Sequence, residues 1–344
     1  MFRPNYTITN ILLKHIKRIN ALVFELNNRR FSSVVLAAFE KTAEAVSAYA
    51  STSIEGNPLP LTEVRKILKS KPSHARDSEK EVLNYNQALQ NLNQRLNKNT
   101  APLSLNLILH IQKQVTNGLL LQFESGKLRQ KPVVVNNPKL RKVVFLPPNA
   151  EDAELLMTDL IEFVHKNKEV IDPLILAGIF HKQMVVIHPF MDGNGRTARL
   201  ATKVLLAQMG LNTFHLFSFE NYYNKNVSRY FQTVGEYGDY YELQEKTDFT
   251  LWLEYFTEGI IDELLRVQKL LPETKPGPQA QLQVHHLKLL GYIKKNDFIT
   301  DRIYATLVTR AKATRTLDFK KLLSFGLIDR KGKGKATYYI VKYN

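Results

Sequence analysis

The chain contains no cysteine in its 344 residues. It can therefore form neither disulfides nor thiolate metal sites, and this composition fits a reducing compartment. No apolar run is long enough to span a bilayer, and residues 1–6 lack the apolar core of a signal peptide. A phosphate loop of the G-x-x-x-x-G-K-[ST] type is missing as well. We expect a soluble cytoplasmic protein that makes no membrane contact.

Acidic residues are scarce relative to basic ones, and the imbalance is greatest near the C-terminus. The net charge is +16, and from Leu271 onward fifteen Lys and Arg stand against five Asp and Glu, so this last fifth carries about +10 of it. An evenly spread charge would indicate only a solvated surface. A basic terminal segment favours an anionic partner, most simply nucleic acid.

Helical patterns dominate the sequence, and we predict a mainly α fold with two or three domains. Residues 51–58 are interpreted as the turn that ends the second helix. Asp172 and Pro173 serve as cap and first-turn proline of a later helix, and Gly210 ends the helix that follows it. The helices are predicted at 10–24, 32–49, from Thr62, and at 78–96, 103–118, 173–187, 196–209 and 248–270.

Strand-like runs occur in two places. The β-branched runs 133–135 and 143–145 flank a turn at 136–139 and predict a hairpin. Three prolines and one glycine between residues 271 and 278 predict a stiff linker. Beyond it we predict helices at 299–308 and 311–325, strands at 327–330 and 337–341, and a basic turn at 331–335.

The most informative segment runs from His188 to Arg199, H-P-F-M-D-G-N-G-R-T-A-R, between two predicted helices. Its glycines let backbone N–H groups converge on an anion, and the following helix adds its positive N-terminal end. Arg196 and Arg199 share a face and can both hold phosphate oxygens. Asp192 is a hard oxygen ligand suited to Mg²⁺ beside phosphate. His188 is the natural general base.

Each of these parts has a simpler interpretation when taken alone. A histidine at a helix end is usually structural, and G-x-G is a common turn. His181, His188 and Asp192 could instead be ligands of a metal-dependent hydrolase, which would need a further strong ligand that the sequence does not offer. The ordered combination of base, carboxylate, Gly-Asn-Gly and paired arginines favours a nucleotide site.

The segment matches the signature of the Fic family, H-P-F-x-D-G-N-G-R-x-x-R, at every specified position. The resemblance covers roughly residues 5–265 and implies a Fic-type helical core with a β-hairpin flap. Residues 126–148 resemble the family's flap. Residues 78–89, which include Glu81, Asn84 and Tyr85, resemble its upstream helix. Residues 226–230 resemble the segment beside the nucleobase, and Trp252 resembles the tryptophan of the family's closing helix.

The Fic family transfers AMP from ATP to a hydroxyl of a target protein, so the resemblance implies a protein adenylyltransferase that uses ATP and Mg²⁺. His188 would take the proton of the attacking hydroxyl, Asp192 would bind Mg²⁺ and Phe190 would anchor the loop. The nucleotide would be held by Gly193, Asn194, Gly195, Arg196, Thr197, Arg199, Asn226 and Tyr230, with Arg199 at the γ-phosphate. Flap residues Val134, Val135 and Asn136 would hold the target by strand addition.

A second motif, Ser51-x-x-x-Glu55-Gly56-Asn57, is on its own a helix end followed by a turn. Beside the signature it resembles the family's inhibitory motif, [S/T]-x-x-x-E-[G/N]. The resemblance implies that Ser51 and Glu55 inhibit in cis, because Glu55 would occupy the arginine that the γ-phosphate needs. Such a charge-assisted contact is worth about 1.5–3 kcal/mol, or about tenfold to a hundredfold in productive binding. It further implies that Glu55 can position a water that removes AMP.

These features divide the chain into an N-terminal helical region with the inhibitory motif (1–104), a Fic core (105–270), a linker (271–280) and a small α+β winged-helix domain (281–344). In the last, Lys312, Arg315, Lys331 and Lys333 are predicted to contact DNA phosphates, although winged helices also serve as protein-contact modules.

An alternative function is a DNA-binding regulator with a silent Fic core. Such a core would tend to lose its base or an arginine, and both are present. The sequence does not identify the target protein or whether its acceptor is Tyr, Ser or Thr. It is also compatible with either a monomer or a homo-oligomer.

Overall fold

The computed structural model describes residues 2–29, 33–98, 102–137, 142–208, 210–211, 215–271 and 282–342. The predicted hairpin turn at 138–139 and most of the predicted linker lie outside these residues. The chain forms two compact units, one of Met1–Asn27 with Glu44–Leu270 and one of Asn28–Ala43 with Leu271–Asn344. No helix within the described ranges is long and apolar enough to cross a membrane.

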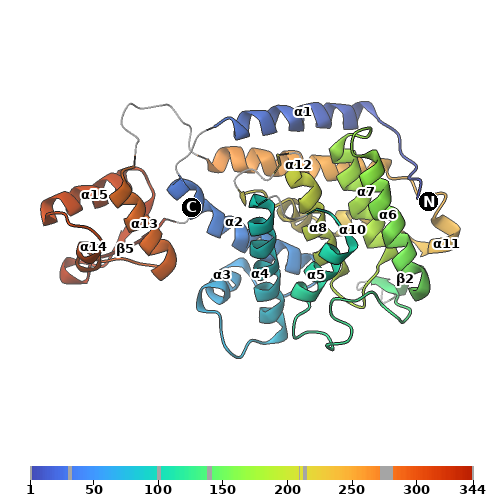
Figure 1. The fold of residues 1–344 in the computed structure, drawn as a ribbon, viewed down its shortest axis with the longest axis horizontal. Coiled ribbons are helices and arrows are strands. Elements are labelled where there is room, and N and C mark those ends of the chain that lie inside the picture. The colour runs from blue at the N-terminus through green and yellow to red at the C-terminus, as the bar shows by residue number, and fades with distance from the viewer. Residues whose placement is uncertain are drawn as a thin grey trace. The chain divides into compact units, whose positions relative to one another are not determined.

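The first unit is helical and is drawn from blue to orange in Figure 1. Its helices are α1 (Asn10–Asn27), the C-terminal half of α2 (Ser33–Ile54), α3 (Leu61–Ser70), α4 (Asp77–Asn97), α5 (Leu105–Val115), η1 (Ala150–Asp152), α6 (Ala153–Asn167), α7 (Pro173–Ile187), α8 (Asn194–Gln208), α9 (Glu220–Lys225), α10 (Val227–Val234), α11 (Tyr240–Leu243) and α12 (Thr250–Leu270).

Helix α7 lies at the centre of this unit because it is apolar on almost every face, which is the pattern of a fully buried helix. It packs against α8 and α12. At Gly178 an added Cβ would come within 2.6 Å of Leu253 Cδ2, so only glycine permits the close approach of α12. The indole N–H of Trp252 donates to the Gly178 carbonyl at 2.8 Å. These contacts hold the first half of α7 against α12, and the Fic-like segment begins where α7 ends.

Three short strands form a sheet beside the helices. β1 (Val135–Asn137) pairs antiparallel with β2 (Lys142–Leu146), with an irregularity between Val135 and Asn136. β2 also pairs in parallel with β3 (Gly238–Asp239), so β2 is central and β1 lies at an edge. The two predicted runs therefore pair, but the first strand lies at 135–137 and not at 133–135, so Asn136 and Asn137, which were expected in the turn, belong to β1. β3 has no local sequence signal and depends on β2, which lies far away in the chain.

The second unit has a core of its own. Helices α13 (Val284–Asn296), α14 (Asp301–Leu307) and α15 (Lys312–Ser324) precede an antiparallel pair, β4 (Ile328–Lys331) and β5 (Tyr338–Val341), with η3 (Gly334–Ala336) between them. Its buried apolar residues include Leu289, Ile299, Phe319 and Leu322. The two helices and two strands predicted here are present, while the winged-helix function stays a prediction.

Candidate active site

The loop from His188 to Gly193 joins α7 to α8, and two residues in it require left-handed backbone. His188 ends α7 with φ +51°, and its N–H donates to the Met184 carbonyl at 3.1 Å. Gly193 has φ +80°, and an added Cβ there would meet Thr116 Cγ2 at 2.9 Å. Glycine is therefore needed at 193 both for its backbone angle and for space.

Asn194 pins the loop to itself. Its side-chain oxygen accepts from the Phe190 N–H and its nitrogen donates to the Phe190 carbonyl, each at 2.9 Å. The Phe190 ring is fully buried, in agreement with its predicted anchoring role. Both ends of the Asn194 side-chain amide are therefore held by Phe190 inside the loop.

Arg129, near the start of the flap, holds the loop from outside. Its N–H donates to the Pro189 carbonyl at 2.9 Å and its Nε to the His188 carbonyl at 2.8 Å. Its Nη2 also donates to the Pro148 carbonyl at the far end of the flap. One buried guanidinium thus ties both ends of the flap to the loop.

The imidazole of His188 is oriented for proton uptake. Its Nδ1 lies 3.2 Å from the Val185 carbonyl, which can only accept, so Nδ1 carries the hydrogen and Nε2 is left as the acceptor. Burial lowers the pKa of His188 below its ordinary value. The ring is therefore neutral at pH 7 and able to take a proton.

Arg196 is buried beneath two carboxylates. Its Nη2 donates to Asp192 Oδ2 at 2.8 Å, and its Nη1 lies 3.5 Å from Glu81 Oε1 on α4. Its Nε and Nη1 atoms are buried and have no hydrogen-bond partner among the described residues. Buried donors without acceptors are costly, so this guanidinium is prepared for an additional anion.

Arg199 is completely buried and is already engaged. Its Nε donates to Ser51 Oγ and its Nη2 to the Ser51 carbonyl, both at 2.8 Å. The Nη2 atom also donates to Glu55 Oε1 at 2.7 Å. Burial alone would lower the pKa of Arg199, but Glu55 and nearby tyrosines raise it overall, so the guanidinium stays charged.

The end of α2 places Glu55 over the loop. The prediction of a turn beginning at residue 51 was wrong, because the helix continues to Ile54. There the Asn57 N–H bonds the Thr52 carbonyl at 3.1 Å and the Gly56 N–H bonds the Ser53 carbonyl at 3.0 Å. With φ +94° at Gly56, this is a Schellman ending that requires glycine directly after Glu55. The Glu55 carboxylate lies so close to Gly195 that a Cβ there would collide with it.

Comparisons with known proteins agree with this geometry. Residues 102–206 match the model of the Fic/DOC family. The chain carries a Fic domain. It is 32% identical over 166 residues to a protein adenylyltransferase Fic of Nematostella vectensis, covering 47% of this chain and 37% of that one. It is 30% identical over 213 residues to protein adenylyltransferase fic-1 of Caenorhabditis elegans, covering 60% and 40%. The chain thus spans less than half the length of these relatives.

Solved structures show the same fold. A Fic family protein from Desulfovibrio desulfuricans G20 superposes with a TM-score of 0.67 at 18% identity, covering all of this chain and 99% of that one. Fic-1 (residues 134–508) from C. elegans superposes with a TM-score of 0.58 at 24% identity, covering 75% and 72%. The predicted fold class, a Fic-type helical core with small β elements, is therefore confirmed.

A buried polar cluster beneath the Fic domain's second arginine was missed by the sequence reasoning. Glu220 is inaccessible to solvent and accepts from Ser47 Oγ at 3.1 Å and Tyr85 Oη at 2.5 Å, with Lys203 Nζ at 3.2 Å. Ser47, Ser51 and Glu55 recur every four residues, so they form one polar face of α2. That spacing is the signal that could have revealed the cluster.

His181 belongs to the core and not to a metal site. Its Nδ1 lies 3.0 Å from Thr202 Oγ1, and its Nε2 lies 3.0 Å from the hydroxyl of Tyr230. Burial lowers the pKa of His181 to about 3. With both ring nitrogens engaged, the alternative of a hydrolase that uses His181, His188 and Asp192 loses its first ligand.

Three further residues predicted to hold the nucleotide, Tyr230, Asn226 and Thr197, have different surroundings. Tyr230 is buried behind Arg199, whose Nη1 lies 3.4 Å from its hydroxyl. Asn226 Oδ1 accepts from the Arg229 N–H at 3.0 Å and caps α10. Thr197 is buried, with no hydrogen-bond partner for its hydroxyl among the described residues. Tyr230 thus contacts Arg199 from within the core, and its contact with the nucleotide stays a prediction.

The flap residues lie where a target segment could reach them. Val134 is exposed and directly precedes β1, which contains Val135 and Asn136. Within the described ranges β1 pairs only with β2, so its outer edge keeps free backbone groups.

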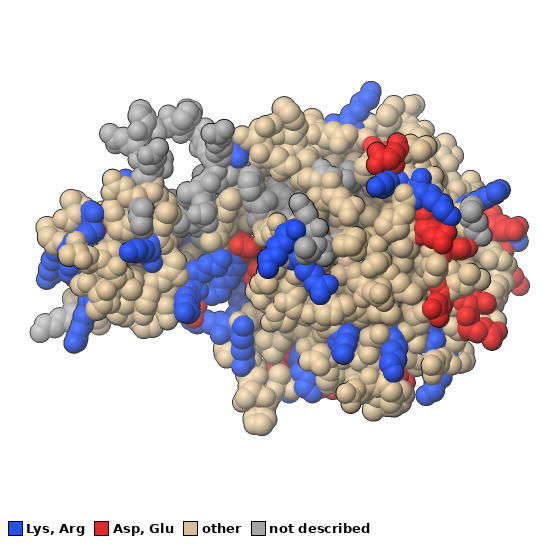
Figure 2. Space-filling model, viewed as in Figure 1, with Lys and Arg blue, Asp and Glu red and all other residues tan. Residues whose placement is uncertain are grey.

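In the second unit, the predicted phosphate contacts separate into two groups. Lys312, Lys331 and Lys333 are exposed, and Figure 2 shows Lys and Arg gathered over this unit on the face drawn. Arg315 is instead engaged within the unit, where it donates to both oxygens of Asp301 at 2.8 and 2.9 Å. That ion pair would have to break before Arg315 could contact a phosphate.

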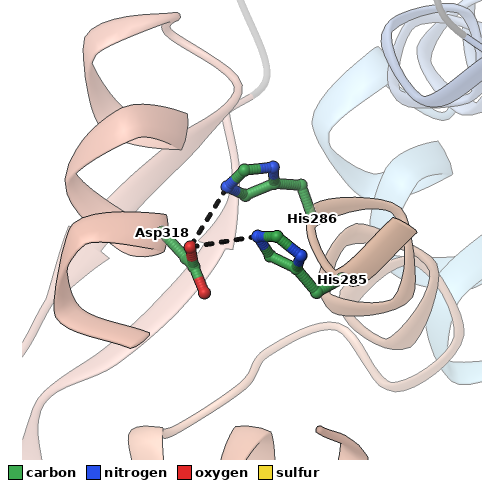
Figure 3. A group of neighbouring side chains, drawn as sticks. All are labelled: His285, His286 and Asp318. Atoms are coloured by element: carbon green, nitrogen blue, oxygen red, sulfur yellow. Dashed lines mark ion pairs between the residues drawn. The ribbon is translucent and has the colours of Figure 1, made fainter. Parts of the chain in front are cut away.

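The same unit holds His285, His286 and Asp318 close together (Figure 3), in a spacing that resembles a metal site. The Nε2 atoms of both histidines lie 3.2 and 3.3 Å from Asp318 Oδ1. However, His286 Nδ1 accepts from the Gln283 N–H at 3.1 Å, and His285 Nδ1 faces the Arg310 guanidinium at 3.3 Å. Both Nε2 atoms must then carry the hydrogen. They face Asp318 without a hydrogen-bond partner of good geometry among the described residues, and they have no lone pair for a metal.

Proposed function

We propose that this chain is a protein adenylyltransferase, which transfers AMP from ATP to a hydroxyl side chain of a target protein. The observation that carries the proposal is the pairing of a neutral, oriented His188 with the buried, unsatisfied donors of Arg196 on the same loop. One group accepts a proton, while the other binds phosphate. The names of the relatives supply the identity of the transferred group.

The proposed step uses few groups of the chain. A target hydroxyl oxygen bonds to the α-phosphorus, the bond from that phosphorus to the bridging oxygen of the β-phosphate breaks, and pyrophosphate leaves. The hydroxyl proton passes to Nε2 of His188. Backbone N–H groups at the start of α8 and the Arg196 guanidinium would hold the phosphate chain, with Arg199 at the γ-phosphate.

The loop also fits Mg²⁺. Asp192 presents a half-exposed carboxylate beside the phosphate-binding arginine, and Mg²⁺ in proteins commonly takes one or two carboxylates plus phosphate oxygens. Bound there, the ion would neutralise phosphate charge.

The proposed enzyme is autoinhibited. Glu55 occupies Arg199 and lies over Gly195, where the phosphate chain would rest. A carboxylate repels phosphate at this position and withdraws the guanidinium that the γ-phosphate needs. Ser51 holds the same arginine through two further contacts. The exposed edge of β1 would hold the target segment by strand addition, which places its hydroxyl near His188.

Mass spectrometry of a cell lysate incubated with ATP and the full-length Glu55→Gly variant tests the proposal. We expect AMP on defined Tyr, Ser or Thr peptides, and none when the variant also carries His188→Ala. The absence of any AMP-bearing peptide, or its persistence without His188, would contradict the assignment.

A second candidate function, DNA binding by residues 281–344, is favoured by the exposed Lys312, Lys331 and Lys333. Affinity of the whole chain for duplex DNA should fall steeply with salt, and each lysine that contacts a phosphate should contribute about 0.9 to the log–log slope. Replacing one of these three lysines by alanine should therefore lower the slope, whereas Lys246→Ala, which changes an exposed lysine of the other unit, should leave the slope unchanged. Affinity independent of salt would exclude phosphate contacts.

A further inference from the structure

Asn57, two residues beyond Glu55, is buried and uses its whole side-chain amide. Its Nδ2 donates to the Ser78 carbonyl at 2.8 Å and to Glu81 Oε2 at 2.7 Å. Its Oδ1 accepts from the Leu59 N–H at 3.1 Å. An amide engaged on both sides fixes the backbone around it. The chain leaving α2 is therefore fastened to the start of α4.

Glu81 continues this contact toward the loop. One of its oxygens binds Asn57, while the other lies 3.5 Å from Arg196 Nη1. The Arg196 side chain is 3% exposed and also pairs with Asp192. Since the remaining Arg196 donors have no hydrogen-bond partner in the described part of the chain, these two carboxylates supply its counter-charge.

The positions of Glu55 and Asn57 are coupled by the turn between them. Only Gly56 separates the two residues, and the N–H groups of Glu55, Gly56 and Asn57 all bond to carbonyls of the last turn of α2. Movement of Glu55 away from Arg199 therefore strains the Asn57 contacts, and loosening of Asn57 frees the turn that carries Glu55.

We propose that Asn57 and Glu81 are positioning residues that hold the inhibitory glutamate in place. The inhibitory segment would then engage both arginines of the loop, Arg199 directly through Glu55 and Arg196 through Asn57 and Glu81. This inference rests on the proposed function and extends its regulation to a second arginine. A purely structural role for Asn57 would leave the nucleotide site unaffected.

Amide hydrogen exchange tests the anchor without any assay of activity. Asn57→Ala should speed exchange at the Glu55 and Gly56 amides by about tenfold, since a hydrogen bond to a charged group contributes about 1.5 kcal/mol or more. The matched control is Asn167→Ala, which removes a side-chain bond to the Phe163 carbonyl in α6. Unchanged protection of the Glu55 and Gly56 amides in Asn57→Ala would show that Asn57 does not hold the turn that carries Glu55.

Labelling from ATP in two backgrounds tests the link to inhibition. Asn57→Ala should raise labelling in the wild-type chain by up to about tenfold, and should add little in a Glu55→Gly chain, because the two changes act through one contact. Equal gains in both backgrounds would mean that Asn57 does not act through Glu55. If Glu55→Gly itself does not raise labelling, the proposed inhibition is wrong. The hydrogen-exchange result still tests, by itself, whether Asn57 holds the turn that carries Glu55.

Glu81→Gln removes the negative charge beside Arg196 but keeps an acceptor for the hydrogen bond from Asn57. The glutamine oxygen can still accept from Asn57, so exchange at Glu55 should stay slow, while Arg196 loses a counter-ion and the KM for ATP should fall with little change in kcat. Glu79→Gln, on the same helix and with the same change of charge, is the control. An unchanged KM in Glu81→Gln would show that Glu81 does not restrain Arg196.

Discussion

Replacing Glu55 by glutamine should release the γ-phosphate position while leaving Arg199 where it is. Arg199 makes two contacts with Ser51 and a longer one with Tyr230, none of which involves Glu55. The glutamine amide keeps the size of the side chain and removes only its charge. The change therefore isolates one charge-assisted hydrogen bond of 2.7 Å between a fully buried guanidinium and a carboxylate that is 30% exposed.

Such a bond contributes about 1.5–3 kcal/mol. The glutamine oxygen can still accept a neutral hydrogen bond worth about 0.5–1.5 kcal/mol, so Glu55→Gln removes about 1–1.5 kcal/mol. If ATP must displace this contact, the Kd for ATP should fall by about tenfold in Glu55→Gln. ADP lacks the γ-phosphate, so its Kd should fall much less. The ratio of the two changes reports on Arg199 directly and does not depend on the unknown target.

Isothermal titration of Mg²⁺–ATP and Mg²⁺–ADP against both chains measures this ratio. Glu63→Gln, an exposed carboxylate paired with Lys66, controls for the general loss of a negative charge. Equal gains for ATP and ADP would refute competition at the γ-phosphate, and no gain for either would refute competition altogether.

Three further outcomes follow from the site and the core. His188→Ala should lower AMP transfer by about 10²–10⁴-fold with little change in the Kd for ATP, measured with labelled ATP in a Glu55→Gly background. Burial lowers the pKa of His181 to about 3 from an ordinary 6.5, so the stability due to the neutral ring is present above pH 6.5 and is lost as pH falls below it. Between pH 7 and pH 5 the free energy of unfolding should drop by about 2 kcal/mol, as followed by urea unfolding and fluorescence of the single tryptophan, Trp252, and the drop should be smaller in His181→Gln. Gly178→Ala should destabilise the chain by about 1–3 kcal/mol in the same assay, because the new methyl overlaps Leu253.

The loop could be predicted from the sequence because its chemistry is local. His188, Asp192 and the arginines lie within one short segment, and the preceding helix has clear end signals. Helices α7 and α8 therefore lie close to where they were expected, although α8 begins at Asn194, two residues early. Nothing in this segment needs a partner from elsewhere to reveal what it can bind.

The end of α2 was harder to predict because polar residues there are satisfied inside the helix and by a distant arginine. Thr52 Oγ1 donates to the Ala48 carbonyl at 2.8 Å, and Ser51 is buried against Arg199. Serine and threonine at such positions look like turn formers in sequence. The reliable stop signal was Gly56, whose positive φ ends the helix.

Long-range pairs account for the remaining differences. Glu220 gathers partners from α2, α4 and α8, and Arg315 is paired with Asp301 from the preceding helix. The four-residue spacing of Ser47, Ser51 and Glu55 marks a polar face of α2, but no spacing in the sequence identifies the partners of Glu220 or Arg315, because these contacts arise only when helices pack. A count of basic residues therefore predicted the charge of the second unit, but not which of its side chains are free.

The most direct test of the account compares two labelled forms of ATP with the full-length Glu55→Gly chain and a cell lysate. If the chain transfers AMP, label from the α-phosphate should appear on protein and should be lost when His188 is also changed to Ala. Label from the γ-phosphate, which protein kinases of the lysate also transfer, should be the same with either chain. A γ-label that depends on His188, or the absence of any α-label that depends on it, would contradict the central claim.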